Sequence, residues 1–249
     1  MRFRLLLSLA VLFVGCGSAT DAPAITVGAA SSLQPLLDSI KPAFEEATGV
    51  EVRYSYAASG AIARQVEQGA PIDVFVLAGT RYVDDLAADG FLRKDSLSSV
   101  ASGQLVVVRP LRIDGANVAF AEAERVAIAN PEIAPYGAAA KAQLEAAGLW
   151  DAVEPQVVYA GSALQAFQFA KAGEVDYAFV PLPLVHISPE GLEVADHAIP
   201  GLKAINVTYA AALVDSTQEP ESALAFIEYL VSPEARQADF GYNSVRGPR

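Results

Sequence analysis

The chain has very few of the residues that build disulfides, metal sites and acid–base catalytic centres. Among 249 residues, cysteine, methionine and tryptophan each occur once and histidine occurs twice. A single cysteine can form no internal disulfide, so a disulfide-stapled fold is excluded. Neither histidine has a second histidine or a cysteine at the spacing of a zinc site, so we expect no bound metal cation.

Catalytic motifs are also scarce. His186 and His197 lie far from any Gly-x-Ser-x-Gly turn, and the chain contains no glycine-rich phosphate loop of the Walker type. Paired carboxylates such as Glu45 and Glu46 fall on helix patterns and indicate solvated faces. We therefore expect no enzymatic activity and no cofactor. A secreted hydrolase that uses a serine with His186 or His197 as its base is the alternative from a different class.

Positive charge is in short supply. Seventeen lysines and arginines stand against 29 aspartates and glutamates, which gives a formal net charge of −12. An acidic body of this kind repels nucleic acid and anionic membranes, so neither is an expected partner. Any anion that binds here must be held by local dipoles and hydrogen bonds.

Only the N-terminus carries a long apolar run. Arg2 and Arg4 precede an almost wholly apolar stretch over 5–14, which is too short to span a bilayer and is typical of an export signal. The segment Phe-Val-Gly-Cys at 13–16 resembles a lipobox, so we predict lipidation at Cys16, with residues 1–23 as signal and linker. An ordinary secretory signal cut between residues 19 and 24 is the alternative. Both place the mature chain outside the cytoplasm, either in the periplasm or on the outer face of the cytoplasmic membrane.

The remainder alternates short apolar strands with amphipathic helices, which predicts an α/β fold with largely parallel sheets. Strands are expected at 25–27, 50–56, 72–77, 104–108, 126–128, 156–159, 177–180 and 205–214. A helical tail is expected over 221–231 and 233–240. The strands near 105–108 and 205–214 stand where a chain would leave one lobe and return to it. We therefore predict one lobe from residues 24–106 and 206–249, and a second from residues 107–205.

Two strand-to-helix junctions share one chemical pattern. The segments 28–33 and 56–62 both run from an apolar strand through Ser31 and Ser32, or through Ser59, into a helix. A helix start has unpaired N–H groups and a partial positive charge, so two of them side by side predict a cradle for an anion. The structural alternative is that the serines are ordinary helix N-caps, which is the position that the pattern gives Ser59.

Five segments follow one another along the chain: Ala-Ala-Ser-Ser-Leu at 29–33, Ser-Gly-Ala-Ile-Ala-Arg-Gln at 59–65, Gly-Ala-Pro-Ile-Asp-Val-Phe at 69–75, Asn-Pro-Glu-Ile-Ala-Pro-Tyr-Gly at 130–137 and Gly-Glu-Val-Asp-Tyr-Ala-Phe-Val at 173–180. Together they resemble the periplasmic molybdate-binding proteins of ABC importers. Each is a weak motif alone, and five in register are specific. The resemblance covers residues 25–235.

This resemblance implies a two-lobed periplasmic binding protein fold, with a ligand cleft between lobes that are joined by a two-strand hinge. It also implies a monomer that captures molybdate or tungstate and delivers it to an ABC permease of the inner membrane. The residues that match family positions at the anion are Ser32, Ser59, Ala78, Tyr136 and Ala163, with Ser31 beside Ser32 as a further donor. Some family members place a tyrosine where this chain has Pro181, so the resemblance implies either that Tyr136 supplies the phenolic donor here or that the site has lost one donor.

The residue types agree with that ligand class. No acidic residue occurs in the junction motifs, and a site made of donors alone suits an anion that retains no proton. Molybdate, tungstate and sulfate meet that condition better than hydrogen phosphate does. Another tetrahedral oxyanion such as sulfate or thiosulfate is the alternative within binding proteins, and a structural lipoprotein without a ligand is the alternative outside them.

Overall fold

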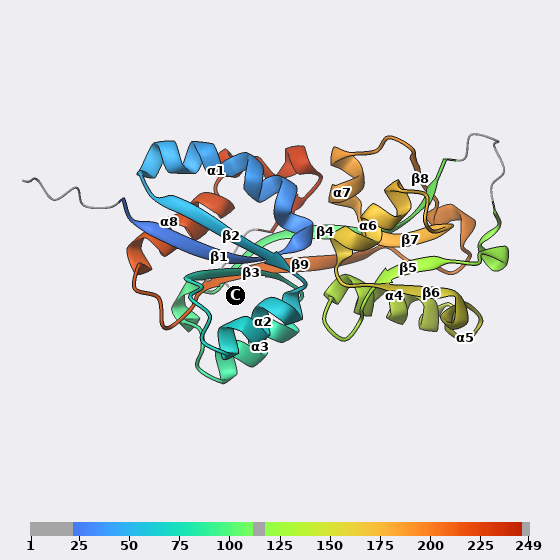
Figure 1. Ribbon diagram of the computed structural model, residues 1–249, viewed down its shortest axis with the longest axis horizontal. Helices are drawn as coiled ribbons and strands as arrows, with labels where there is room; N and C mark the ends of the chain where they lie inside the picture. Colours follow the sequence, from blue (N-terminus) through green and yellow to red (C-terminus); the bar gives the residue numbers. More distant parts are fainter. Residues whose placement is uncertain (1–21, 112–117, 246–249) are drawn as a thin grey trace, which may run out of the picture.

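The computed structural model describes residues 22–111 and 118–245. Two groups of strands and helices lie side by side, and two long strands run through both (Figure 1). We call the groups lobe I and lobe II and define them by their elements below. The predicted lipidation site, Cys16, lies outside the described residues.

Lobe I is built on three parallel strands joined by helical crossovers. β1 is central and pairs with β2 on one side and β3 on the other. Every residue of β3 is buried, as expected for a strand covered by helices on both faces. The elements of lobe I are β1 (Ala24–Ala30), α1 (Gln34–Thr48), β2 (Glu51–Ala57), α2 (Ser59–Glu67), β3 (Val74–Ala78), α3 (Arg81–Ala88) and α8 (Pro220–Val231).

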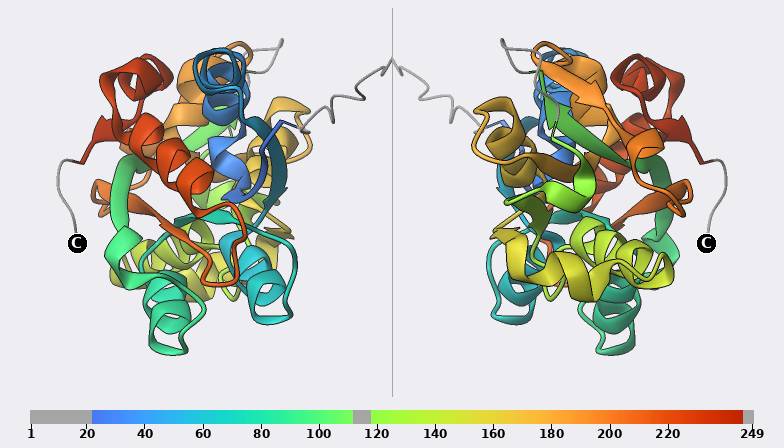
Figure 2. Two further views of the ribbon diagram at one scale, coloured as in Figure 1. Left: turned by 90° about the vertical axis from the view of Figure 1, so that its left-hand side faces the viewer. Right: turned by 90° about the vertical axis from the view of Figure 1, so that its right-hand side faces the viewer.

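Lobe II repeats this arrangement with a different segment of the chain. β5 pairs in parallel with β6 and with β7. The elements of lobe II are β5 (Val126–Ala129), α4 (Pro135–Ala146), α5 (Trp150–Val153), β6 (Val157–Ala160), α6 (Ala163–Lys171), β7 (Tyr177–Pro181), α7 (Leu182–Ile187) and β8 (Leu192–Val194). Helices cover the strands on both faces in each lobe (Figures 1 and 2).

The strands that cross between the lobes are β4 (Ser98–Pro110) and β9 (Ile205–Leu213). They pair with each other in antiparallel fashion from Ser98 to Leu105, and β4 then pairs with β7 over 105–108. One continuous sheet results, in the order β2-β1-β3-β9-β4-β7-β5-β6. The expectation of largely parallel sheets holds within each lobe and is wrong at the centre, because one crossing strand leaves lobe I and the other returns to it.

Two other expectations need correction. The sequence predicts a strand over 104–108, whereas β4 already begins at Ser98, where serines, alanine and glycine hide the apolar signal. The predicted helix over 233–240 is instead a pair of 3-10 turns, Pro233–Ala235 and Gln237–Phe240, followed by β10 (Asn243–Ser244). Arg236 separates the turns with a left-handed φ of 49°, which an α-helix does not tolerate.

Short 3-10 turns fill several connections, and one of them continues β1. They span Ser31–Leu33, Lys94–Ser96, Phe120–Glu122, Glu154–Gln156 and Asp196–Ala198. Close backbone approach fixes the start of α4 in lobe II, since a Cβ on Gly137 would collide with the Ala129 carbonyl at the end of β5. Gly137 therefore lets α4 begin directly against β5, and this places the preceding residue, Tyr136, between the lobes.

Candidate functional site

The strand ends of lobe I bring the predicted serines together. In the parallel pairing, Ala30 at the end of β1 lies opposite Ala57 at the end of β2, and β3 ends beside them at Ala78. The carboxyl ends of adjacent parallel strands meet at one edge of a sheet. Ser31, Ser32 and Ser59 follow these ends and are all buried.

One small cavity, which we call the junction cavity, is surrounded by all six residues that the sequence singled out at the anion. Ser31, Ser32, Ser59 and Ala78 come from lobe I, and Tyr136 and Ala163 begin helices of lobe II. The full lining is Ala30, Ser31, Ser32, Ala57, Ala58, Ser59, Ala78, Ala134, Pro135, Tyr136 and Ala163. The cavity is small, with a volume of about 10 Å³, roughly what one ordered water molecule needs. Sugars, amino acids and peptides do not fit this conformation.

The lining carries hydroxyls and backbone groups but no ionisable acid or base other than the tyrosine. Aspartate, glutamate, lysine, arginine and histidine are all missing from it. Burial raises the pKa of Tyr136 well above its usual range, so the phenol is neutral at physiological pH. An anion in this cavity would meet neutral hydrogen-bond donors and helix starts, with no carboxylate to repel it.

Ser59 corrects the expectation that it caps α2. The helix begins at Ser59 itself, its N-cap is Ala58, and no side chain caps it. The Ser59 Oγ instead accepts a hydrogen bond from the Ala78 N–H at 3.1 Å. A hydroxyl that accepts one bond still has its own proton to donate. Ser59 is therefore oriented by β3 with its proton available to a guest in the cavity.

Ser32 is held from two sides by tyrosines of the crossing strand and the C-terminal segment. Its Oγ lies 2.8 Å from the Tyr209 Oη, and its backbone carbonyl accepts a hydrogen bond from the Tyr242 hydroxyl at 2.7 Å. Both tyrosines are buried, and their rings meet edge to face with centroids 5.6 Å apart. Neither residue was predicted, because a tyrosine in an apolar strand, such as Tyr209, or after a C-terminal turn, such as Tyr242, carries no sequence signal for the partner of its hydroxyl.

Tyr136 belongs to the same set of hydroxyls. Its own hydroxyl donates to the Gly103 carbonyl of β4 at 3.0 Å and accepts from Tyr209 at 3.1 Å. Its one proton is therefore directed at Gly103 and not into the cavity, so in this conformation Tyr136 does not act as the phenolic donor that the resemblance implies. A Cβ on Gly103 would meet the Tyr136 hydroxyl, so this close approach needs glycine there. Pro181, the last residue of β7, is buried and does not line the cavity.

Backbone contacts join the two lobes beside the junction cavity. The Gly60 N–H of α2 donates to the Ile133 carbonyl at 2.9 Å, and the Tyr82 hydroxyl of α3 donates to the Glu132 carbonyl at 2.9 Å. A Cβ on Gly60 would lie 2.7 Å from the Tyr82 Oη and 3.1 Å from the Ile133 Cα. We call these contacts the lobe latch. They hold the loop before α4, and with it Tyr136, against lobe I.

The histidines do not support a catalytic site. His186 on α7 and His197 in a 3-10 turn are both exposed, and neither lines the junction cavity. Within the described ranges, no three residues of the His, Cys, Asp and Glu types gather as metal ligands. Asp73 has a structural role, because its carboxylate accepts the Thr26 N–H at 2.8 Å and the Thr217 hydroxyl at 2.7 Å.

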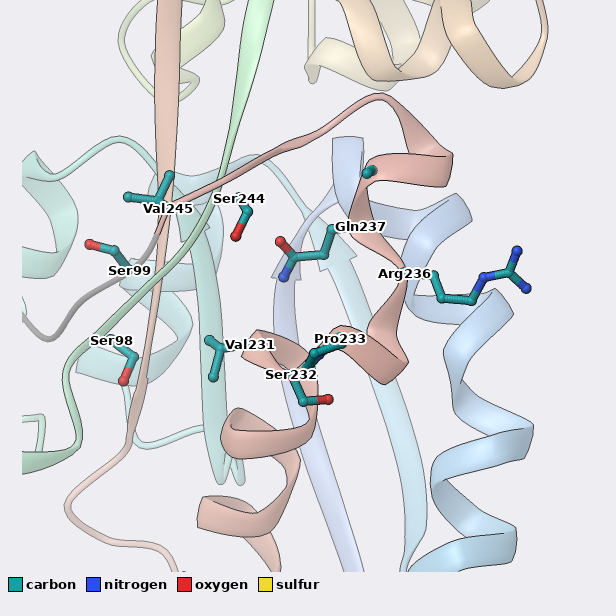
Figure 3. A pocket seen from close by; sticks show the side chains of 10 residues that line it. Ser98, Ser99, Val231, Ser232, Pro233, Arg236, Gln237, Ser244 and Val245 are labelled. Atoms are coloured by element: carbon teal, nitrogen blue, oxygen red, sulfur yellow. The ribbon is translucent and has the colours of Figure 1, made fainter.

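A larger pocket of about 630 Å³ lies elsewhere on lobe I, between the start of β4 and the C-terminal turns (Figure 3). It shares no residue with the junction cavity. Its one charged lining residue, Arg236, extends away from Ser244 and Gln237 and pairs with Asp239.

The fold and the junction cavity define a two-lobed binding protein that encloses a small solute between its lobes. A family model described as bacterial extracellular solute-binding protein matches residues 25–242, and the chain belongs to that family. It is 30% identical over 236 residues to the molybdate-binding protein ModA of Rhodobacter capsulatus, covering 93% of this chain and 92% of that protein. It is 29% identical over 242 residues to ModA of Escherichia coli, covering 92% and 91%.

A solved structure agrees with these relatives. The periplasmic molybdate-binding protein of Azotobacter vinelandii superposes with a TM-score of 0.76 at 26% identity, covering 89% of this chain and all of that chain. In the described part of this chain, no helix combines the length and apolar character that crossing a membrane requires.

Proposed function

We propose that this chain is the solute-binding component of an ABC importer and that it captures molybdate, and tungstate with it, in the junction cavity. The single observation that carries the proposal is the cavity itself. Three serines, one neutral tyrosine and the starts of three α-helices surround a small cavity, with no acidic side chain in its lining. The molybdate-binding relatives, which match over nearly their whole length, support the same ligand.

Donor-only chemistry decides which anions suit the cavity. A fully ionised tetrahedral oxyanion accepts hydrogen bonds at every oxygen, whereas hydrogen phosphate also carries a proton that needs an acceptor. Sulfate meets the first condition as molybdate does, and differs in its smaller radius. In a cavity held by the strand ends, by Tyr209 behind Ser32 and by the lobe latch, a smaller ion would leave some donors imperfectly paired.

The other parts of the proposal concern the chain in its cellular setting. We infer that the mature protein is exported to the periplasm or the outer face of the cytoplasmic membrane, is tethered by lipid on Cys16 and acts as a monomer. A permease of the inner membrane would receive the anion. The predicted lobes, residues 24–106 with 206–249 and residues 107–205, are proposed as the two bodies that close on it. Diacylglyceryl-modified Cys16 in the mass spectrum of mature protein is the expected observation for the anchor.

The test of the ligand is a calorimetric titration of the chain from residue 22 onward, at fixed salt, with molybdate, tungstate, sulfate and phosphate. We expect one-to-one binding of molybdate and tungstate, with sulfate at least tenfold weaker and phosphate silent. Sulfate binding as tightly as molybdate would assign the cavity to the alternative oxyanion. A chain that binds none of the four would refute the proposal.

A further inference from the structure

The hydrogen bonds around Tyr209 fix the direction in which Ser32, Tyr136 and Tyr209 each donate their hydroxyl proton. Each hydroxyl has one proton to donate. The Gly103 carbonyl can only accept, so Tyr136 donates to it, and the Tyr136 oxygen then accepts from Tyr209. With its proton given to Tyr136, Tyr209 must accept from Ser32. The Ser32 proton is thereby directed at Tyr209 and not into the junction cavity.

This direction conflicts with anion binding. A Ser32 hydroxyl that donates to Tyr209 offers only its lone pairs to the cavity, where an oxyanion offers only lone pairs as well. For Ser32 to donate to an anion, its bond to Tyr209 must reverse, so that Tyr209 becomes the donor. Tyr209 then no longer donates to Tyr136, and Tyr136 keeps its own hydrogen bond to the Gly103 carbonyl. Only hydroxyl rotations are needed, and no bond to hydrogen is broken.

We propose that Tyr209 is a positioning residue for the anion: its single proton turns from Tyr136 to Ser32 when the ligand binds, and this turns the Ser32 proton toward the ligand. The inference rests on the proposed function and adds a residue outside the cavity lining. The Ser32 Oγ and the Tyr209 Oη lie 2.8 Å apart, a distance that suits a hydrogen bond in either direction, so the reversal needs no movement of the oxygens.

The surroundings of Tyr209 suit this role. Its side chain is 0% exposed, so bulk solvent does not reach the Tyr209 hydroxyl behind Ser32. The Tyr242 hydroxyl holds the Ser32 backbone at 2.7 Å, so Ser32 can change its donor direction without moving its backbone. Removing the Tyr209 hydroxyl would leave Ser32 without its partner and free to rotate, and the fixed spacing that discriminates between ions of different radius would be lost.

The test is Tyr209→Phe, titrated with molybdate and sulfate beside the unaltered chain. We expect roughly tenfold weaker molybdate binding, since one charge-assisted hydrogen bond loses its support. The ratio of molybdate to sulfate affinity should fall as well. In a Ser32→Ala background the same substitution should change affinity by less than about twofold, because Tyr209 acts through Ser32.

Tyr177→Phe is the matched control, since Tyr177 is a buried tyrosine of lobe II whose hydroxyl donates to the Val118 carbonyl at 2.6 Å, away from the cavity. It should leave the affinity unchanged. Unaltered or tighter molybdate binding in Tyr209→Phe, or an equal loss in the Ser32→Ala background, would overturn the inference while leaving the proposed function intact. An unaltered chain that binds no anion would overturn both.

A second measurement covers the case in which Tyr209→Phe does not fold. With 3-fluorotyrosine at position 209, the fluorine resonance reports the hydrogen bonding of that phenol. We expect it to shift when molybdate is added to the otherwise unaltered chain and to stay in place in the Ser32→Ala chain. A resonance that stays in place in both chains, while molybdate binds, would contradict the inference.

Discussion

Two strand-to-serine-to-helix junctions, one in each lobe, use the same residue type for different purposes. In lobe I, the Ser59 hydroxyl does not cap α2 and instead accepts a hydrogen bond from the Ala78 N–H at the cavity wall. In lobe II, Ser162 is the N-cap of α6, and its hydroxyl accepts the Gln165 N–H at 3.2 Å. The comparison shows that lobe I supplies hydroxyls to the cavity, whereas at this junction of lobe II the hydroxyl serves the helix and Ala163 reaches the cavity.

The residue three positions further on explains part of this difference. After Ser162 it is Gln165, whose side chain bonds back to the Gly161 N–H at 2.6 Å, much as in a capping box. After Ser59 it is Ile62, which is buried and cannot return such a bond. Ser31 shows the limit of the pattern, because Gln34 follows it at the same spacing and no side chain caps either helix there.

The largest expected effect comes from removing the lobe I hydroxyls. Ser32→Ala and Ser59→Ala should each weaken molybdate binding by ~1–3 kcal/mol, because a ligand oxygen loses its donor in a dry site. Ser59→Ala should also lower the melting temperature, since the buried Ala78 N–H loses its acceptor. Calorimetry and thermal melts measure the two effects separately. Full affinity in both variants would show that the junction cavity is not the anion site.

Lobe closure should come next in size. In Gly60→Ala the new methyl group would press on the Tyr82 hydroxyl and on the Ile133 backbone, and only the tyrosine can move aside cheaply. We expect binding to weaken by ~1–2 kcal/mol through poorer closure, although Gly60 does not line the cavity.

Tyr82→Phe is the matched variant for the lobe latch, because it removes the bond to the Glu132 carbonyl without adding bulk. The loss of molybdate affinity in Tyr82→Phe should be smaller than the loss in Gly60→Ala. Scattering profiles with and without molybdate would show whether the lobes close less completely in Gly60→Ala. A variant that closes and binds normally would mean that the latch does not limit binding.

Ser162→Ala tests the other side of the comparison. Loss of this N-cap should lower the free energy of unfolding by ~1 kcal/mol, because the Gln165 N–H loses its acceptor. Molybdate affinity should change by less than about twofold, since the Ser162 hydroxyl does not line the cavity. Urea unfolding measures the free energy of unfolding, and calorimetry on the same preparation measures the molybdate affinity. An affinity loss as large as that of Ser59→Ala would remove the distinction between the two junctions.

Sequence alone located the cavity lining but not the residues behind it. Ser31, Ser32 and Ser59 follow strand ends, which are visible in a sequence pattern, whereas Ala78, Tyr136 and Ala163 were assigned to the anion through the resemblance to molybdate-binding proteins. Tyr209 and Tyr242 contact Ser32 across 177 and 210 residues of chain. Such contacts depend on how β9 and the C-terminal turns pack, which local pattern does not encode. The two crossing strands were predicted, but for the same reason their antiparallel pairing with each other was not.

The smallest expected effect is that of pH on binding. Burial raises the pKa of Tyr209 to about 12, and burial also raises the pKa of Tyr136 and Tyr242, so these phenols stay protonated and neutral. With no carboxylate or histidine in the lining, molybdate affinity at fixed salt should be constant within about twofold from pH 6 to pH 9. A steep change in that range would reveal an ionisable group at the site.

The buried tyrosines should make the stability fall with pH in the alkaline range. An exposed tyrosine in the unfolded chain loses its proton near pH 10, whereas the buried Tyr209 keeps it to about pH 12. The folded state therefore holds more protons above pH 10, and the stability that is fully present below that pH is lost as the pH rises through the folded pKa. Urea unfolding from pH 8 to 11 should show this decline, with a smaller slope in Tyr209→Phe. An equal slope in both chains would mean that deprotonation of Tyr209 does not contribute to the loss of stability at alkaline pH.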